Sequence, residues 1–546
     1  MGAKKSYRAG VIPIKIRVFC AENPMTLATR QNTWCEPFIA LMLAAVIVLF
    51  AFLWQGHTGF SLWDEGFLWY GAQRVMLGEV PIQDFMAYDP GRYYWSAAFM
   101  TAVGSSGIMA LRLAIDCFQV LGIFVGLLLI SRTMKPYAKY SLGFLVVAGI
   151  ILALWMFPRH KIFDLSLSVF LTGALSFLIA KPSHGRYFVA GLCVGLVAFF
   201  GRNHGLYGIA GSLGCLIWLS LSTTGVRGFI QSGLYWGLGV VVGFSPIYMM
   251  ALFIPGFGTA FLDSVRLIFE MKTTNISLPV PWPWKVDFSS NSFVESVRQA
   301  LVGVFFILLP AFGFGSVLWV TVQRFRKLSV PPAFVASAFL TLPYAHYAYS
   351  RADIGHLAQG LFPFLLACLT LISVQTSRLK WPLVLTLAAS SLWIMSAYQP
   401  GAQCLDQARC VSIDISDSSL SVDSNTANDI ELLRTLTSTY AANGQNILVT
   451  PFWPGAYALL NRKAPMWSIY ALWPRSVEFQ REEISRIQAS APAFAFVFDF
   501  ALDGRDDLRF KNTYPLIYKY ITDHFEKLPD SPSPAYEIYK ARKENP

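Results

Sequence analysis

The sequence has few charged residues for its length. Of its 546 residues, 14% are Asp, Glu, Lys or Arg, whereas 55% are hydrophobic and 15% are aromatic. A typical soluble domain carries about 25% charged residues. Lipid cannot hydrate a charge, so membrane proteins confine their charges to the segments between long apolar runs. The composition therefore predicts an integral membrane protein.

Several other features are missing from the sequence. It has no internal repeats, no low-complexity tract, no nucleic-acid-binding motif, and no spacing of its eight cysteines that resembles a zinc site. The basic N-terminus lacks a short apolar run followed by a small-residue cleavage site, so no removed signal peptide is expected and the first long apolar run would act as an uncleaved anchor. Nucleic-acid partners and a structural zinc site are not expected.

The net charge of +11 is unevenly distributed along the chain. Residues 399–546 hold 15 Lys and Arg against 18 Asp and Glu, so the basic excess lies in residues 1–398. Basic loops that face anionic lipid explain this excess without nucleic acid.

Apolar runs of about 17–25 residues can cross a membrane as helices. The sequence has eleven candidates, which cover 37–55, 108–131, 140–157, 162–180, 186–200, 204–222, 229–253, 299–322, 330–349, 354–376 and 380–398. Lys and Arg concentrate in short cytoplasmic loops. With residues 1–36 as a basic cytoplasmic segment, the inner loops carry Arg132, Lys135, Lys139, Lys181, Arg186, Arg227, Arg324, Arg326, Lys327, Arg378 and Lys380. This alternation predicts a transmembrane domain over 37–398 and an outer location for 399–546.

The C-terminal part, 399–546, has the pattern of an α/β domain. Its periodicity predicts helices near 427–442 and 475–489 and strands near 446–450, 494–500 and 535–540. The class expected is therefore a mainly α, polytopic membrane protein with an extracytoplasmic α/β domain. Cys404 and Cys410 lie together in this part, and an oxidising outer compartment predicts a disulfide between them.

Two long outer loops precede that domain. The loop 56–107 holds five acidic residues, and its segment 66–77 is predicted to be an amphipathic helix lying in the membrane interface, followed by a turn at 88–92. The loop 254–298, rich in Pro and Trp, is our candidate for a lid. Arg112 and Asp116, spaced i and i+4 in a span, are expected to pair with each other.

The adjacent acids Asp64 and Glu65 directly follow the first span. One interpretation is a solvated loop end. The other is a general base that takes the proton of an acceptor hydroxyl as its oxygen attacks a sugar carbon. Neighbouring residues cannot point the same way on a helix or a strand. One is therefore expected to act as the base while the other orients the donor or the loop.

Three basic clusters lie on the predicted outer side, against the positive-inside tendency. They include Arg159, His160, Lys161, Arg202, His204, Arg351 and His356. Such side chains can donate charge-assisted hydrogen bonds to a phosphate leaving group. The alternative is contact with lipid headgroups, or ion pairing with Asp164 and Asp353. Further candidates for holding acceptor or substrate in the outer loops are Tyr88, Asp89, Arg92, Arg266 and Lys272.

The stretch WDEGFLWYGAQRVMLGEVPIQDFMAYDPGRYYW, with a weaker match at RADIGHLAQGLF (351–362), resembles the GT-C superfamily of membrane glycosyltransferases. Within that superfamily it is most similar to the bacterial branch that resembles protein mannosyltransferases and the lipid A aminoarabinose transferase. The resemblance implies a polyprenyl-phosphate sugar donor, Asp64 as the base with Glu65 beside it, and basic outer-loop residues on the lipid phosphate. Some members use a divalent metal and others do not; no further DXD-like motif is present, so no metal site is predicted and metal use stays open.

The function expected is transfer of a sugar from a polyprenyl-phosphate donor to an acceptor hydroxyl at the outer face of a bacterial inner membrane, with inversion. The sugar could be a pentose such as arabinofuranose or a hexose such as mannose, and the acceptor a glycan, a glycolipid or a protein. The alternatives are a flippase or transporter for a lipid-linked sugar, an O-antigen ligase or polymerase, and a non-catalytic assembly protein.

Overall fold

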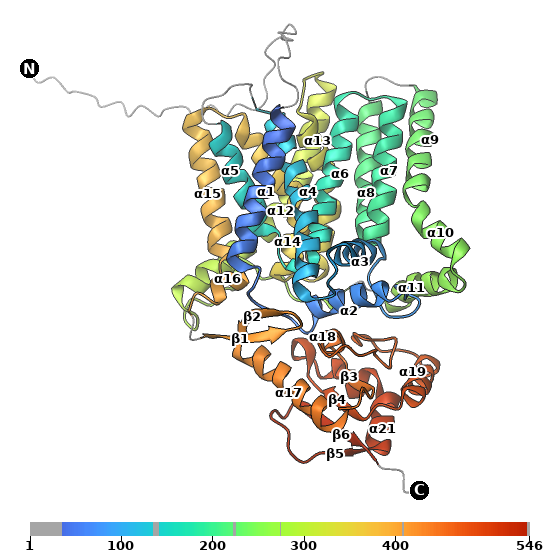
Figure 1. The fold of residues 1–546 in the computed structure, drawn as a ribbon. Coiled ribbons are helices and arrows are strands. Elements are labelled where there is room, and N and C mark those ends of the chain that lie inside the picture. The colour runs from blue at the N-terminus through green and yellow to red at the C-terminus, as the bar shows by residue number, and fades with distance from the viewer. Residues whose placement is uncertain (1–34, 135–140, 222–224, 273–274, 407–408, 543–546) are drawn as a thin grey trace, which may run out of the picture.

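The computed structural model describes residues 35–134, 141–221, 225–272, 275–406 and 409–542. A layer of roughly parallel helices stands above a smaller α/β part, and short helices lie between them (Figure 1). The predicted cytoplasmic segment 1–36 lies outside the described residues apart from its last two, as do Lys135 and Lys139.

Each of the eleven predicted spans is helical in the structure. The corresponding helices are α1 (Cys35–Gln55), α4 (Ile108–Ser131), α5 (Ser141–Trp155), α6 (Ile162–Ala180), α7 (His184–Phe200), α8 (Arg202–Ser220), α9 (Val226–Gly243) with α10 (Ser245–Phe253), α12 (Phe293–Phe325), α13 (Pro332–Ser350), α14 (Ile354–Ser373) and α15 (Ser377–Met395). Within the described residues, five helices are each long and apolar enough to cross a membrane: α1, α4, α6 with the turn before it, α12 and α14. The protein is thus a multi-pass membrane protein.

One predicted span, 229–253, is broken. Helices α9 and α10 meet at Phe244 with a bend of 45°. Pro246 lies in the first turn of α10 and has no backbone N–H, so it cannot continue the hydrogen-bond ladder of α9. Beyond the break, α11 (Phe257–Met271) turns away from the direction of the layer (Figure 1).

The loop after α1 differs from the interfacial helix predicted there. Helix α2 (Asp64–Met76) does form, but its residues 65–72 are buried between the helical layer and the C-terminal part. Gly66 and Gly455 are in direct backbone contact, since a Cβ built on Gly66 would lie 2.4 Å from the Cα of Gly455. Helix α18 (Pro454–Leu459) therefore covers the face that the sequence pattern assigns to lipid. The predicted turn at 88–92 leads directly into α3 (Gly91–Val103).

The loop predicted over 254–298 is shorter than expected, because α12 already begins at Phe293. Between α11 and α12 the chain forms a short 3-10 turn, η2 (Pro283–Lys285), where the rings of Trp282 and Trp284 stack at 5.2 Å. Before α6, a second 3-10 turn, η1 (Arg159–Lys161), carries one of the predicted basic clusters.

The C-terminal part contains the predicted α/β elements. Strands β3 (Ile447–Thr450) and β4 (Phe494–Phe498) are parallel, and β6 (Tyr536–Ala541) pairs antiparallel with both β4 and β5 (Phe525–Lys527), in the order β3-β4-β6-β5. Helices α17 (Ser424–Tyr440), α19 (Val477–Ser490), α20 (Phe510–Thr513) and α21 (Pro515–His524) accompany this sheet, and η4 (Leu502–Gly504) and η5 (Asp506–Leu508) follow β4. Parallel pairing of β3 and β4 needs a crossover, which α18 and α19 provide.

A hairpin of β1 (Cys410–Ile415) and β2 (Ser418–Asp423) connects the two parts of the chain, after the short helix α16 (Pro400–Gln403). Cys404 and Cys410 form the disulfide predicted from the sequence, with their Cα atoms 5.5 Å apart. The core continues from the helical layer into the C-terminal part, where Trp63 stacks on Phe452 at 5.0 Å. The C-terminal part is thus packed directly against the loop that follows the first span.

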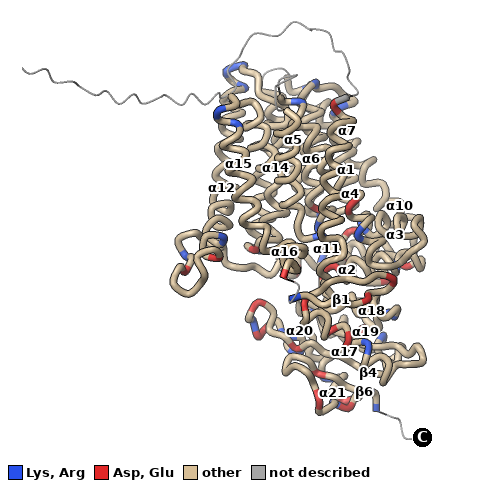
Figure 2. The backbone as a smooth tube through the Cα atoms, turned by 60° about the vertical axis from the view of Figure 1, so that its left-hand side comes forward, with Lys and Arg blue, Asp and Glu red and all other residues tan. Residues whose placement is uncertain are grey.

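Charged residues are distributed unevenly along the long axis of the molecule. Lys and Arg gather at the end of the layer farthest from the C-terminal part, whereas Asp and Glu are frequent in the C-terminal part and near its junction with the layer (Figure 2).

Candidate functional site

A cavity of about 560 Å³ lies where the helical layer meets the C-terminal part. Both parts contribute to its wall. Residues from α2, η1, α6, the start of α8 and the segment 347–359 line it from the layer, and Tyr470, Leu472, Trp473 and Leu502 line it from the C-terminal part. Volumes of about 300–1,000 Å³ are typical of sites for small molecules and cofactors. The cavity is therefore the candidate functional site.

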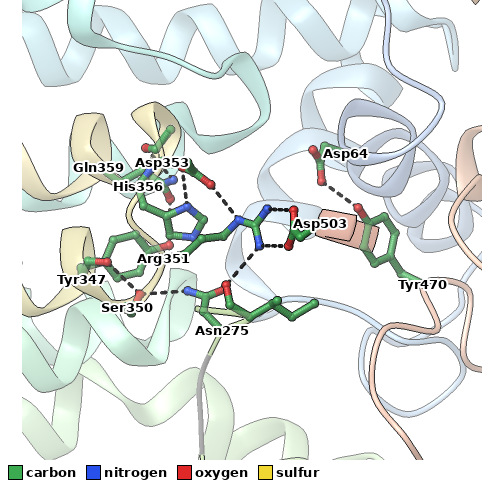
Figure 3. A network of polar contacts seen from close by, with 12 residues as sticks. Asp64, Asn275, Tyr347, Ser350, Arg351, Asp353, His356, Gln359, Tyr470 and Asp503 are labelled. Carbon is green, nitrogen blue, oxygen red and sulfur yellow. Dashed lines mark hydrogen bonds and ion pairs between the residues drawn. The ribbon is translucent and has the colours of Figure 1, made fainter. Parts of the chain in front are cut away.

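Asp64 is the first residue of α2, and its side chain faces the cavity. The hydroxyl of Tyr470 donates a hydrogen bond of 3.4 Å to its Oδ1 (Figure 3). Burial raises the pKa of Tyr470 well above its ordinary value, and the neighbouring negative charge of Asp64 adds to that rise. Within the described part of the chain, Asp64 makes no ion pair. The predicted base thus faces the cavity with a neutral hydroxyl as its partner.

Glu65 points the other way and does not line the cavity. Its carboxylate receives two hydrogen bonds of 2.8 Å from Arg112 and one of 3.3 Å from Arg159. Burial acts to raise the pKa of Glu65, but the two guanidinium groups, Arg112 first, outweigh it and lower the pKa to about 2. Arg112 also donates to the carbonyl oxygens of Gly56 and Gly59. Glu65 therefore fixes the loop after α1, one of the two roles that the sequence left to the second acid.

This cluster corrects two predictions. Arg112 pairs with Glu65 across the structure, and the predicted ion pair of Arg112 with Asp116 in the same helix is wrong. Arg159 pairs with Glu65 in this buried cluster and donates a hydrogen bond to the carbonyl oxygen of Gln55. It does not line the cavity, so its predicted place at a phosphate is not supported. The i, i+4 spacing identifies only possible partners within the same helix, whereas the actual partner of Arg112 lies in a different helix, α2.

A second buried network forms the floor of the cavity. Arg92 makes a bidentate pair with Asp164, with its nitrogens 2.7 and 3.2 Å from the two oxygens. His204 Nε2 lies 3.2 Å from the same carboxylate, and its Nδ1 bonds the hydroxyl of Tyr344 at 2.9 Å. Burial acts to lower the pKa of Arg92, but the charge of Asp164 outweighs it and raises the pKa. The floor is thus closed by charges that satisfy one another, as the alternative interpretation of the basic clusters expected.

Asp89 and Arg202 form a similar pair near the entry to α8. Arg202 Nε lies 2.5 Å from Asp89 Oδ1, and the backbone N–H of Arg202 donates to Oδ2 at 2.7 Å. The Arg202 side chain also bonds Ser264 of α11 and does not line the cavity. Its predicted role at a phosphate is therefore not supported, whereas Asp89 does line the cavity.

Lys161 is the basic residue of η1 that enters the cavity, together with His160. Its Nζ lies 3.9 Å above the centre of the Tyr88 ring and 3.9 Å from Asp164 Oδ2, whose oxygens are already bonded to Arg92 and His204. The contact with Asp164 is too long for a hydrogen bond. The ammonium group thus interacts with the Tyr88 side chain and, in the described residues, makes no close ion pair.

Arg351 and His356 lie across the cavity from Asp64 (Figure 3). Asp353 caps α14 by accepting the backbone N–H of His356 at 2.8 Å, and it also bonds His356 Nδ1 and Arg351 Nε. Arg351 further makes a bidentate pair with Asp503 at 2.7 and 2.8 Å. The hydrogen bonds to Asp503 are the largest contribution to the raised pKa of Arg351.

Two predicted substrate residues lie away from the cavity. Arg266 is exposed on α11, where it pairs with Asp263, and Lys272 follows the end of that helix and is also exposed. Tyr88, Asp89 and Arg92 do line the cavity, although Asp89 and Arg92 are bound in ion pairs. The predicted lid loop contributes Asn275 and Ile276 to the lining.

The sequence missed the contribution of the C-terminal part to this cavity. Tyr470 and Trp473 lie in the aromatic segment 465–474, which falls between the predicted elements. Aromatic residues in a polar domain, outside its helices and strands, were the available signal. In the described residues, no group of three or more His, Cys, Asp and Glu is placed to hold a metal ion.

No family model and no curated protein matches the sequence. Solved structures do match its fold, so the resemblance predicted from the sequence is confirmed at the level of the fold. ArnT from Cupriavidus metallidurans bound to undecaprenyl phosphate aligns with a TM-score of 0.55 and 11% identity over 94% of this chain and 99% of that chain. The apo form of the same protein aligns with a TM-score of 0.55 and 12% identity over 91% of this chain and 97% of that chain. The archaeal oligosaccharyltransferase AglB from Archaeoglobus fulgidus aligns with a TM-score of 0.49 and 11% identity, over 94% of this chain and 75% of that chain.

Proposed function

We propose that this protein transfers a sugar from a polyprenyl-phosphate donor to an acceptor hydroxyl, with Asp64 as the general base. The support is the charge pattern of the cavity. Among the carboxylates that line it, Asp89, Asp164 and Asp353 are each bound by Arg or His. Asp64 instead receives a bond from the neutral hydroxyl of Tyr470. A carboxylate that no cation neutralises can accept a proton from a substrate.

The chemistry follows from that placement. The acceptor oxygen attacks the anomeric carbon as its proton passes to a carboxylate oxygen of Asp64. The bond from the anomeric carbon to the phosphate oxygen breaks, and the polyprenyl phosphate leaves with the electron pair. Attack opposite the leaving group inverts the anomeric carbon. Because hydrolysis competes with transfer, a cavity closed on one side by Tyr470 and Trp473 would favour the acceptor over water.

Lys161 is the residue that we assign to the phosphate. Its nearest carboxylate oxygen in the described residues is 3.9 Å away, so the ammonium group can move to a phosphate oxygen without breaking a close ion pair. A positive charge beside the leaving group stabilises the negative charge that develops there. His160 and His356, which also line the cavity, are positioned to add hydrogen bonds to the same group.

The fold supports the class of donor. In its crystal structure, ArnT from Cupriavidus metallidurans binds undecaprenyl phosphate, and that protein aligns with this chain over nearly its whole length. A polyprenyl chain would lie along the apolar helices while its phosphate enters the cavity. The sugar, whether a pentose such as arabinofuranose or a hexose such as mannose, and the acceptor, whether glycan, glycolipid or protein, are to be identified by assay.

The charge distribution supports an outward-facing cavity. Lys and Arg gather at the end of the helical layer opposite the C-terminal part (Figure 2). Because such residues favour the cytoplasmic side, the cavity and the C-terminal part are assigned to the outer side of a bacterial inner membrane. The disulfide between Cys404 and Cys410 fits an oxidising compartment.

The test is transfer by the full-length protein in lipid nanodiscs with a panel of polyprenyl-phosphate pentoses and hexoses. We expect at least one donor to be consumed, with release of polyprenyl phosphate and a product of inverted anomeric configuration. If no donor in the panel is bound or turned over, the proposal fails. Retention of configuration would remove Asp64 from the role of base for a single displacement.

A further inference from the structure

The Arg351 guanidinium is occupied by two carboxylates. Its Nε bonds Asp353 at 2.7 Å, while its two terminal nitrogens bond the two oxygens of Asp503 at 2.7 and 2.8 Å. Figure 3 shows this group between His356 and the Asp64–Tyr470 pair. The fork of a guanidinium fits a phosphate as well as a carboxylate, in the same bidentate geometry. Asp503 therefore occupies the position in which Arg351 could hold a phosphate.

The charges of this group do not favour the addition of a further anion. One guanidinium faces two carboxylates, and even a protonated His356 would bring the group only to neutrality. A phosphate that approached Arg351 would meet no net positive charge. It can bind there only if one of the carboxylates leaves.

The two carboxylates differ in how firmly they are held. Asp353 caps α14 and bonds both the backbone and the ring of His356, so its position is fixed by three groups. In the described residues, the Asp503 side chain bonds Arg351 alone. Asp503 also lies in a short 3-10 turn with a φ of 55°, next to Gly504 with a φ of 72°. A short turn beside a glycine can move at lower cost than a helix cap.

We propose that Asp503 takes the place of the donor phosphate on Arg351 and is exchanged for it when the donor binds. This inference rests on the proposed function, and it assigns Arg351 as a second phosphate ligand beside Lys161. Asp503 belongs to the segment 502–508, and Leu502 of that segment lines the cavity. The exchange therefore couples occupancy of the donor site to release of a segment of the C-terminal part that borders the cavity.

The wild-type protein provides the first test, and it needs no variant. Hydrogen exchange of the full-length protein in nanodiscs is measured with and without undecaprenyl phosphate. We expect the backbone amides of 502–508 to exchange faster when the lipid phosphate is bound. Unchanged exchange in this segment while the lipid phosphate binds would overturn the proposal. Release by inorganic phosphate alone, or by phosphatidylglycerol alone, would overturn the assignment to the donor.

The second test uses Asp503→Asn, with Asp507→Asn as the matched control. Asp507 lies in the same segment and pairs with Arg505 on the surface, so the control removes the same charge without touching Arg351. If Asp503 holds Arg351 most of the time, its removal is expected to tighten binding of undecaprenyl phosphate about tenfold. The control should bind like the wild type, and 502–508 of Asp503→Asn should exchange fast with or without the lipid.

The outcomes separate this inference from the proposed function. Equal or weaker binding by Asp503→Asn, in a protein whose wild type binds the lipid phosphate, would show that the Arg351–Asp503 pair only joins the two parts of the chain. Failure of both the wild type and Asp503→Asn to bind would instead overturn the proposed function, and this inference with it.

Discussion

The two sides of α2 carry the same kinds of charged group in different arrangements. Behind the helix, Glu65 is enclosed by Arg112 and Arg159, and all three side chains are buried or nearly so. In front of it, Asp64 faces a cavity with a tyrosine hydroxyl as its partner. Consecutive residues of a helix point about 100° apart, so one acid can serve the fold while its neighbour serves the chemistry. The comparison teaches that the partner of a carboxylate, more than its place in the sequence, determines its role.

The largest effect is expected from Asp64→Asn. The amide cannot accept the proton of the acceptor, so the transfer rate should fall about a thousandfold, within the range typical of a lost general base. Binding of the donor and the unfolding temperature should stay at wild-type values, because Asp64 makes no ion pair in the described structure. Transfer, lipid binding and thermal unfolding are measured beside Asp414→Asn, an exposed strand residue. If Asp64→Asn instead lowered the unfolding temperature markedly, Asp64 would have a structural role like that of Glu65.

Glu65→Gln should lower the stability of the fold. Removing this charge leaves Arg112 and Arg159 without their shared carboxylate, which is expected to lower the free energy of unfolding by about 3–5 kcal/mol. The measurement is unfolding in detergent. The control is Glu431→Gln, which breaks an exposed pair with Arg434 and should cost at most about 1 kcal/mol. Equal costs for the two variants would contradict the account of the buried cluster.

The effect of Glu65→Gln should depend on pH in one direction. The pKa of Glu65 is lowered from 4.5 to about 2 in the folded protein. Its stabilising contribution is therefore complete above pH 4.5 and is lost as the pH falls toward 2. The difference in unfolding free energy between the wild type and the variant should stay constant from pH 8 to 5 and shrink below pH 4.5. A difference that varies between pH 8 and 5 would point to another titrating group.

Lys161→Met should slow sugar transfer and leave the stability of the fold unchanged. Loss of the ammonium beside the leaving group is expected to slow transfer about a hundredfold, and Lys161→Arg should restore part of the rate. The matched control is Lys519→Met, which removes an exposed lysine of α21 paired with Asp523. A normal rate for Lys161→Met would leave Arg351 and the histidines as the ligands of the phosphate.

The smallest effect is expected from Tyr470→Phe. The ring would keep its contacts with Phe67 and Phe452 and lose only the hydrogen bond of 3.4 Å to Asp64. One such bond is worth about 0.5–1.5 kcal/mol, so the rate should change by less than about tenfold. Tyr518→Phe, which removes a hydroxyl from Glu537 far from the cavity, is the control. A thousandfold loss would give Tyr470 a part in the chemistry.

The sequence predicted the helical layer and placed Asp64, Lys161, His204 and Arg351 on one side of it, because long apolar runs and the positions of Lys and Arg are local signals. It could not identify the partner of Arg112, which is separated from Glu65 by 47 residues. Nor could it foresee that the apolar face of α2 packs against α18, since a face suited to lipid is equally suited to a protein partner. Asp503 and Tyr470 were missed because only the tertiary fold brings them to the cavity.

The most direct measurement compares the transfer rate per folded molecule for Asp64→Asn and Glu65→Gln, with the same polyprenyl-phosphate donor and after the folded fraction of each has been isolated. The account predicts that folded Asp64→Asn is nearly inactive and that folded Glu65→Gln, although less of it survives, retains most of the wild-type rate. Substantial transfer by Asp64→Asn, with little or none by folded Glu65→Gln, would contradict it.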